Sequence, residues 1–155
     1  MNKSISNKIE NRIKEDLSPT RNLSGVHLKF VAAIAIIWSL FQLWYASPFP
    51  FMFNIGMFKG LPARAIHLGF ALTLAFLIFP ISKGKKISFL DILISFTAAF
   101  CCLYIYFFYD QLVDRGGVLL TITIGESISI PIELIIGSFG IIFLLEATRR
   151  AIGLP

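Results

Sequence analysis

The chain has 155 residues, of which 56% are hydrophobic and 15% are charged, and its net charge is +5. Soluble domains average about 25% charged residues, so a soluble fold of this composition would expose much apolar surface to water. The composition therefore indicates a membrane protein, and the basic residues flank apolar runs rather than forming the long basic face of a nucleic-acid-binding protein.

Four apolar segments are long enough to cross a bilayer as helices, which takes about 20 residues each. They cover residues 28–46, 62–81, 87–109 and 131–149. The first is long and lacks a small-residue cleavage site, so we expect it to remain as an anchor rather than to be removed as a signal peptide. The predicted fold is all-α, with a membrane domain of four helices over residues 28–150.

Lysine and arginine are distributed unevenly among the segments that flank these spans. Eleven lie in the N-terminal arm, the second connection and the C-terminal end, whereas the first and third connections hold Lys59, Arg64 and Arg115. Cytoplasmic segments of membrane proteins are enriched in these residues, so both termini and the second connection are predicted to be cytoplasmic. Aromatic residues that end the first and third spans, such as Trp44 and Tyr109, fit the opposite interface.

The acidic residues of the predicted spans lie near span ends and have structural interpretations. Asp91 falls in the first turn of the third span, where an S-x-x-D pattern favours helix capping over ion binding. Glu133 lies in the first turn of the fourth span, where a negative charge suits the helix dipole. Glu146 has the spacing to pair with Arg149 or Arg150, which complement the dipole at the cytoplasmic end of this span.

Arg64 and His67 lie in the first two turns of the second span, on its outer side. They are candidates for interfacial anchoring or for contact with an external partner. No span carries an acidic or basic residue at its centre, and Gln42 is the deepest strongly polar group of the first span. Coupled transporters usually place carboxylates or broken helices near the midplane, so no ion or substrate site is predicted within this chain.

No motif indicates an enzyme, a cofactor or a metal site. Cys101 and Cys102 are adjacent within an apolar run, and their spacing matches neither a metal site nor a CxxC redox motif. We interpret them as small apolar fillers; a quinone-linked thiol oxidoreductase would need spaced cysteines near an interface. A dimeric exporter of the small multidrug resistance kind would need a glutamate in the first span, and residues 30–45 contain none.

The segments outside the spans have patterns of their own. In the N-terminal arm, residues 1–27, apolar side chains recur every fourth position from residue 5 to residue 17, which predicts either an amphipathic helix on the cytoplasmic leaflet or a solvated tail. The first outer connection, residues 47–60, is rich in Phe, Met, Pro and Gly and is predicted to be irregular and to rest on the membrane. The third, residues 116–134, alternates polar and apolar residues, which predicts an extended or hairpin-like segment outside the membrane.

Five short motifs occur in a fixed order along the chain. They are RNLSG at residues 21–25, WSLF at 38–41, R-x-x-HL at 64–68, FP at 79–80 and EATRRxxG at 146–153. This succession resembles the N-terminal segment of fused permeases of the tripartite ATP-independent periplasmic (TRAP) transporter family. The resemblance covers about residues 20 to 155, and its most specific parts are EATRRxxG and then R-x-x-HL.

The resemblance implies a sodium-coupled uptake system of three parts in the bacterial inner membrane. A periplasmic binding protein delivers a small organic anion, a large membrane component holds the sodium and substrate sites, and a small four-helix component, which this chain resembles, braces the large one. Arg64, His67 and the third connection are candidates for docking the binding protein.

The resemblance also sets an expectation for residues 151–155, because fused permeases continue there into the large component. We expect that component to be a separate polypeptide, or the permease to be truncated or split, and this chain not to transport alone. The alternative interpretation is an independent small tetraspan membrane protein.

Overall fold

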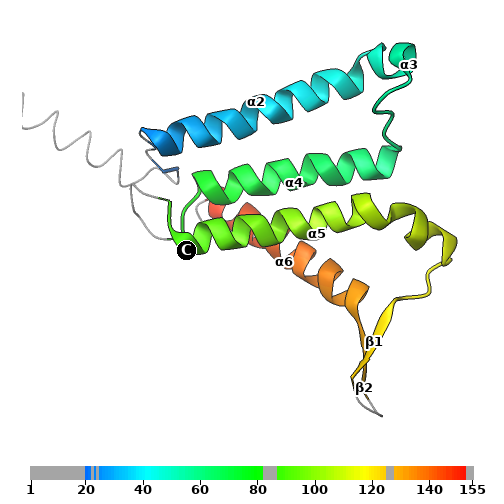
Figure 1. Cartoon of the computed structure of the whole chain (residues 1–155). Helices are drawn as coiled ribbons and strands as arrows, with labels where there is room; N and C mark the ends of the chain where they lie inside the picture. Colours follow the sequence, from blue (N-terminus) through cyan, green and yellow to red (C-terminus); the bar gives the residue numbers. More distant parts are fainter. Residues whose placement is uncertain (1–19, 22, 24, 82–86, 125–127, 153–155) are drawn as a thin grey trace, which may run out of the picture.

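The computed structural model describes residues 20, 21, 23, 25–81, 87–124 and 128–152. This part of the chain forms four long helices, one short helix and a two-stranded hairpin (Figure 1). The amphipathic pattern predicted for residues 5–17 lies outside the described residues.

Three helices are long and apolar enough to cross a membrane: α2 (Val26–Ala46), α4 (Gly60–Ile78) and α5 (Phe89–Asp114). Their positions confirm the first three predicted helical segments, with ends that differ by a few residues. α4 begins before Pro62 because a proline, which lacks an N–H, is tolerated in the first helical turn. α5 continues past the apolar run into polar residues such as Gln111, a good helix former.

The fourth predicted span corresponds to α6 (Ile132–Ile152), which has 21 residues, as α2 does. Unlike α2, it carries Glu133 near one end and Glu146, Arg149 and Arg150 near the other, so its uncharged stretch, residues 134–145, is shorter than the roughly 20 residues of a typical span. By length and apolar composition, the described part of the chain therefore contains three candidate spans rather than four.

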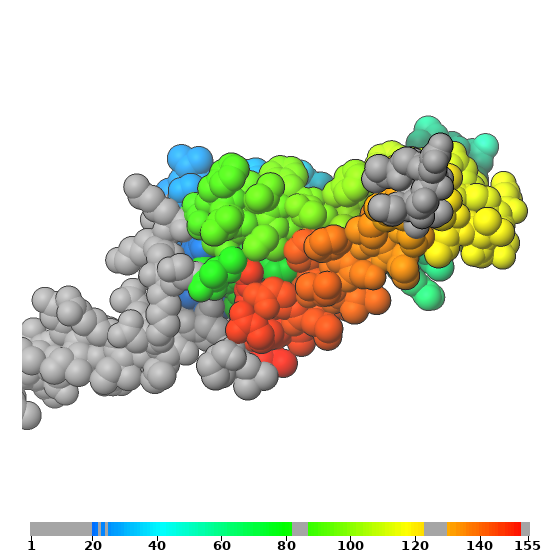
Figure 2. Space-filling view, turned by 90° about the horizontal axis from the view of Figure 1, so that it is seen from below, coloured from blue at the N-terminus to red at the C-terminus, as the bar shows by residue number. Residues whose placement is uncertain are grey.

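α4 is the central helix of the bundle. It packs along α5 on one side and against α2 on the other, and α6 lies against α5 and α4 (Figures 1 and 2). The apolar segment of α4 is 44% buried within the protein, whereas that of α2 is 6% buried. α2 and the outer face of α5 therefore direct large apolar side chains such as Ile37 and Phe96 away from the protein, as suits contact with lipid or another membrane protein.

The main apolar core lies between α4, α5 and α6. The Phe76 ring of α4 is fully buried and meets the Phe143 ring of α6 edge-on, with centroids 6.1 Å apart. A Cβ atom at Gly69 would lie 3.4 Å from the Cβ of Cys102, so small residues let α4 and α5 approach closely. Cys101 and Cys102 are both buried and free, which fits their predicted role as apolar fillers.

The first outer connection was predicted to be irregular but contains a short helix, α3 (Phe49–Phe53). Prolines occur at its start, where a missing N–H costs little. Asn54 ends it in the left-handed conformation, with φ of 54°. Gly56 also has a positive φ, and a Cβ there would lie 3.0 Å from the Trp44 ring, so this position requires glycine.

The third connection forms an antiparallel hairpin of β1 (Thr121–Ile124) and β2 (Ile128–Pro131), which confirms the hairpin alternative. β2 runs directly into α6, and Ile132 N–H donates to the carbonyl of Leu120 at 3.1 Å. The hairpin consequently projects beyond the ends of the helices (Figure 1).

Candidate functional site

Charged side chains from three parts of the chain, the segment before α2, the start of α5 and the end of α6, meet at one end of the helices. Their centre is Asp91 in the first turn of α5, which is fully buried. Its Oδ2 accepts a hydrogen bond from Arg21 Nη2 at 2.5 Å, and its Oδ1 lies 3.5 Å from Arg150 Nη1 and accepts from Ile81 N–H at 3.3 Å. A carboxylate removed from water needs such partners. The Asp91 cluster is defined here as Arg21, Asp91, Glu146, Arg149 and Arg150.

Arg21 attaches the segment that precedes α2 to the end of α4. Its backbone N–H donates to the carbonyl of Ile78 at 2.8 Å, and its Nη1 donates to the carbonyl of Leu77 at 3.5 Å. Carbonyls in the last turn of a helix have no partner within the helix, so Arg21 satisfies two of them. Its side chain is only 1% exposed, and its Nε has no hydrogen-bond partner among the residues that the structure describes.

Arg150 and Glu146 bring the end of α6 into the cluster. Arg150 Nε donates to Glu146 Oε1 at 2.7 Å, its guanidinium lies 4.8 Å from the centroid of Phe76, and its Nη1 donates to the carbonyl of Phe79 at 3.4 Å. Arg149 donates to the same carboxylate at 2.8 and 3.0 Å. Glu146 thus pairs with both predicted partners, but the Arg149 side chain is 47% exposed and that of Arg150 is 4% exposed.

The structure corrects the predicted capping role of Asp91. Ser88 occupies the N-cap position of α5 but makes no side-chain capping hydrogen bond. The Asp91 carboxylate instead faces two arginines that lie 70 and 59 residues away in the sequence. Charge-assisted hydrogen bonds are about twice as strong as neutral ones, so a buried carboxylate within reach of two guanidinium groups favours that pairing.

Sequence reasoning treated Arg21 as one of many cytoplasmic basic charges and missed its pairing with Asp91. One signal was present: an acid in a span needs a counter-charge, and the predicted topology placed Arg21 and Arg150 on the same side of the membrane as Asp91. The choice between these and the other basic residues on that side required the packing of the helices.

A second cluster, Tyr104, Arg115 and Glu133, holds the opposite end. Glu133 Oε1 lies 2.7 Å from Arg115 Nη2 and accepts from the Tyr104 hydroxyl at 3.4 Å, and its Oε2 accepts from Leu120 N–H at 3.0 Å. The Glu133 side chain is nearly buried. Glu133 therefore connects the start of α6 to the end of α5 and to the base of the hairpin, a wider contact set than the predicted interaction with its own helix dipole.

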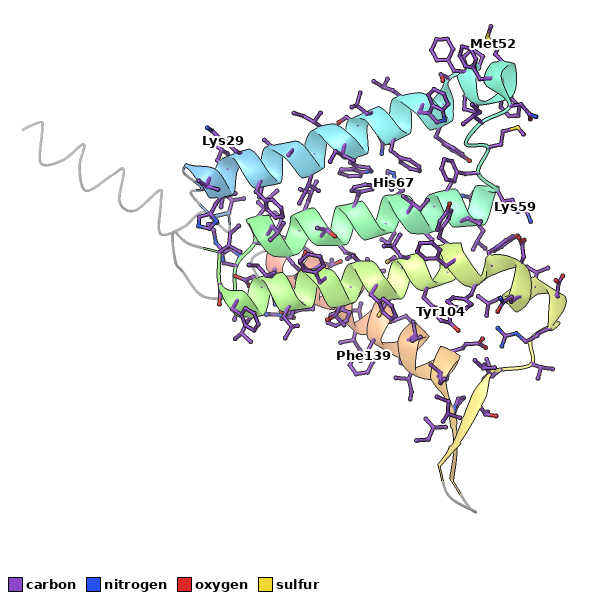
Figure 3. The ribbon with its side chains drawn as sticks, in the orientation of Figure 1. Lys29, Met52, Lys59, His67, Tyr104 and Phe139 are labelled. Atoms are coloured by element: carbon purple, nitrogen blue, oxygen red, sulfur yellow. The ribbon has the colours of Figure 1, made fainter. Side chains whose placement is uncertain are left out.

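His67 of α4 points toward α2 (Figure 3). Its Nδ1 lies 3.3 Å from Trp38 Nε1 and 2.7 Å from Gln42 Nε2, and the tautomer that carries its proton on Nε2 can accept from these donors. The Trp38 and His67 rings also meet edge-on, with centroids 5.0 Å apart. Arg64, one turn earlier, is exposed, as His67 is. The two residues predicted as docking candidates thus differ, since His67 contacts a neighbouring helix.

A further ion pair, at the same end of the helices as Glu133, is exposed to solvent. Lys59, which precedes α4, is hydrogen-bonded to Asp110 near the end of α5, and both side chains are mostly exposed. The hydrogen bond from Lys59 to Asp110 raises the pKa of the lysine. Within the described ranges, no group of three or more His, Cys, Asp or Glu side chains is placed to hold a metal ion. The charged groups with the closest contacts bind one another and the backbone, and so fix the helices relative to each other.

Three helices that are long and apolar enough to cross a bilayer indicate a multi-pass helical membrane protein. No family is identified by comparison, because no protein-family model matches the chain and no curated protein or solved structure is significantly similar to it.

Proposed function

We propose that this chain is a four-span protein of the bacterial inner membrane and the small scaffold component of a TRAP-type permease. In this proposal α6 is the fourth span, and the Asp91 cluster lies at the cytoplasmic face with both termini, as the distribution of basic residues favours. Its partners are a large membrane component and a periplasmic binding protein. The assembly performs sodium-coupled uptake of a small organic anion.

The observation that carries this proposal is the convergence of the motifs that resemble TRAP permeases. The motif residues Arg21 and Arg150 both face the Asp91 carboxylate. Arg150 also donates hydrogen bonds to Glu146 and to the carbonyl of Phe79. Trp38 and His67 meet between α2 and α4. Residues from different motifs lie together in the fold, which supports their interpretation as parts of one pattern.

The placement of charge supports a bracing role over a carrier role. No lysine, arginine, aspartate or glutamate lies at the centre of α2, α4, α5 or α6. Carriers bind ions and cargo near the midplane with carboxylates or with the exposed backbone of broken helices. Here the Asp91 and Glu133 clusters join α4, α5 and α6 near their ends, as a rigid support requires.

α6 is suited to cross the membrane despite its charges. Its 21 residues extend about 31 Å at 1.5 Å per residue, close to the hydrocarbon thickness of about 30 Å. Its charged residues lie toward its ends, where the cost of a charge falls from the roughly 2.5–3.5 kcal/mol of the bilayer centre. Each of these residues is also paired: Glu133 with Arg115, and Glu146 with both arginines.

Transport assays with defined components test the proposal. The purified chain is reconstituted in vesicles with an inward sodium gradient and radiolabelled small carboxylates, either alone or with the two partners that the proposal requires, a large hydrophobic membrane protein and a secreted binding protein, sought among the neighbouring genes. We expect uptake only from the complete set. Uptake by the chain alone would refute the scaffold role, and no uptake from either preparation, with no complex formed, would favour an independent tetraspan protein.

Topology is tested separately with reporters. Green fluorescent protein fused after the last residue should fluoresce, and alkaline phosphatase inserted at the tip of the β1–β2 hairpin should be active, because the first folds in the cytoplasm and the second in the periplasm. The reverse pattern would contradict the proposed orientation and leave the charge clusters unaffected.

A further inference from the structure

An apolar groove lies over α4, between α2 and α5. Its volume is about 280 Å³, and its lining includes Phe30 and Ile34 of α2, Leu77 of α4 and Ala99 of α5. All three helices are candidate membrane spans, so the surroundings of this groove are hydrocarbon rather than water.

The two hydroxyl groups in the lining are already used within the protein. Thr73 Oγ1 donates to the carbonyl of Gly69 at 2.7 Å, and Ser95 Oγ donates to the carbonyl of Thr73 at 3.4 Å. A bound water needs about two to four polar partners, and a polar solute needs similar compensation. The groove therefore selects an apolar occupant.

The dimensions of the groove match one slender chain. On α5 it runs from Ile92 to Leu103, which is about 16 Å at 1.5 Å per residue and about half of the roughly 30 Å hydrocarbon core. An acyl chain that extends from one leaflet toward the bilayer midplane has this length.

One end of the groove adjoins the Asp91 cluster. Leu77, whose carbonyl accepts from Arg21, lines this end, as does Ile92, the neighbour of Asp91. Lys29 lies at the same end, in the first turn of α2 (Figure 3). A lysine at the membrane surface attracts an anionic headgroup.

We propose that the groove is a binding site for one acyl chain of a phospholipid, drawn from the leaflet that borders the Asp91 cluster. The bound chain fills the space between α2 and α5, which otherwise contact each other little because α4 separates them.

Native mass spectrometry of the full chain, purified in mild detergent, tests this site. We expect one retained phospholipid per chain. Ala99→Phe places a ring in the groove, and we expect it to lower the lipid-bound fraction at least about tenfold, which corresponds to about 1.4 kcal/mol. Ile142→Phe adds the same kind of ring at an exposed position of α6 and should leave the fraction unchanged. Equal retention by the two variants would overturn the proposal.

If Ala99→Phe fails to fold, or if detergent removes the lipid, photolabelling of the unmodified chain tests whether the groove binds a phospholipid. The chain is reconstituted with a phospholipid that carries a diazirine in its acyl chain, and the adducts are mapped by peptide sequencing. Adducts should be more frequent on the groove side of α5, residues 92–103, than on the exposed face of α6, residues 139–145. Labelling that follows exposure alone means ordinary surface lipid and rejects a specific site. The same experiment with anionic and zwitterionic headgroups shows whether the headgroup contributes.

Discussion

The two ends of this helix bundle are both held by ion pairs, but the pairs differ in burial. Asp91 and the two guanidinium groups that face it are almost inaccessible to water. At the opposite end, Glu133 is nearly buried but Arg115 is partly exposed, and the pair of Lys59 with Asp110 is open to solvent. A charge that is out of water cannot be solvated when its partner is removed, so the same substitution has very different consequences at the two ends.

α2 is attached to the bundle at fewer points than the other long helices are. α4, α5 and α6 are connected through the Asp91 cluster, and α5 and α6 are connected again through Glu133. α2 is fixed at one end through Arg21 just before it, and farther along through the contact of Trp38 and Gln42 with His67. The bundle thus has a three-helix part, α4 to α6, that is joined at both ends, and a helix, α2, that is held at fewer points and forms one wall of the apolar groove.

The largest effect should come from Asp91→Asn. This change leaves Arg21 buried without a compensating negative charge and leaves Arg150 with Glu146 alone, and breaking a buried pair in this way costs about 3–5 kcal/mol. We expect a fall of that size in the free energy of unfolding, measured by denaturant titration of the purified protein in detergent. Asp110→Asn makes the same chemical change at an exposed pair and should have little measurable effect. Equal losses for the two variants would contradict the argument from burial.

Arg149 and Arg150 are adjacent on α6 and allow an exposed and a buried arginine of the same cluster to be compared. Arg150→Met removes the contacts with Asp91, Glu146 and Phe76, but Asp91 keeps Arg21, so we expect a loss of about 2–3 kcal/mol, below that of Asp91→Asn. Arg149→Met changes the net charge equally and removes an exposed pair, so it should change stability little. Denaturant titration of both variants under one condition gives the difference directly. The reverse order would mean that charge near the membrane surface, rather than burial, decides stability.

The sequence predicts the helices well because their signal is local. Apolar runs of about 20 residues identified the helical segments, and the spacing of Glu146 with Arg149 and Arg150 predicted pairs that lie within one helix. The partners of Asp91 could not be read from spacing, because they come from before α2 and from the end of α6. The burial of Asp91 depends on three elements packing together, which no local pattern reports. α3 was missed for a different reason, since the prolines and glycine of its segment indicate turns as readily as a short helix.

Glu133→Gln tests the opposite end. The amide keeps the shape of the side chain but loses the charge that binds Arg115, so we expect a loss of about 1–3 kcal/mol, between the two extremes above. Hydrogen exchange offers a local measurement, because Leu120 N–H donates to Glu133 and should exchange faster in this variant. Asp91→Asn under native conditions should leave that amide unchanged. Protection of Leu120 that is the same in wild type and Glu133→Gln would show that the hairpin base is held by β pairing alone.

The smallest effect should come from His67→Phe, which keeps an aromatic ring between α4 and α2 but removes the acceptor for Trp38 and Gln42. Polar side-chain contacts between membrane helices contribute about 0.6 kcal/mol on average and up to about 1.7 kcal/mol, so we expect a loss in that range. Arg64→Gln, one turn away and exposed, is the matched control and should preserve stability.

Fluorescence in a Trp44→Phe background reports on Trp38 as the remaining tryptophan, and its emission should shift when its indole N–H loses the acceptor. Emission and stability that both match wild type would mean that apolar packing and Arg21 alone hold α2. In that case, filling the neighbouring groove would be the main way to change how firmly α2 is attached. A measurable loss would instead make His67 the second point at which α2 is attached to α4.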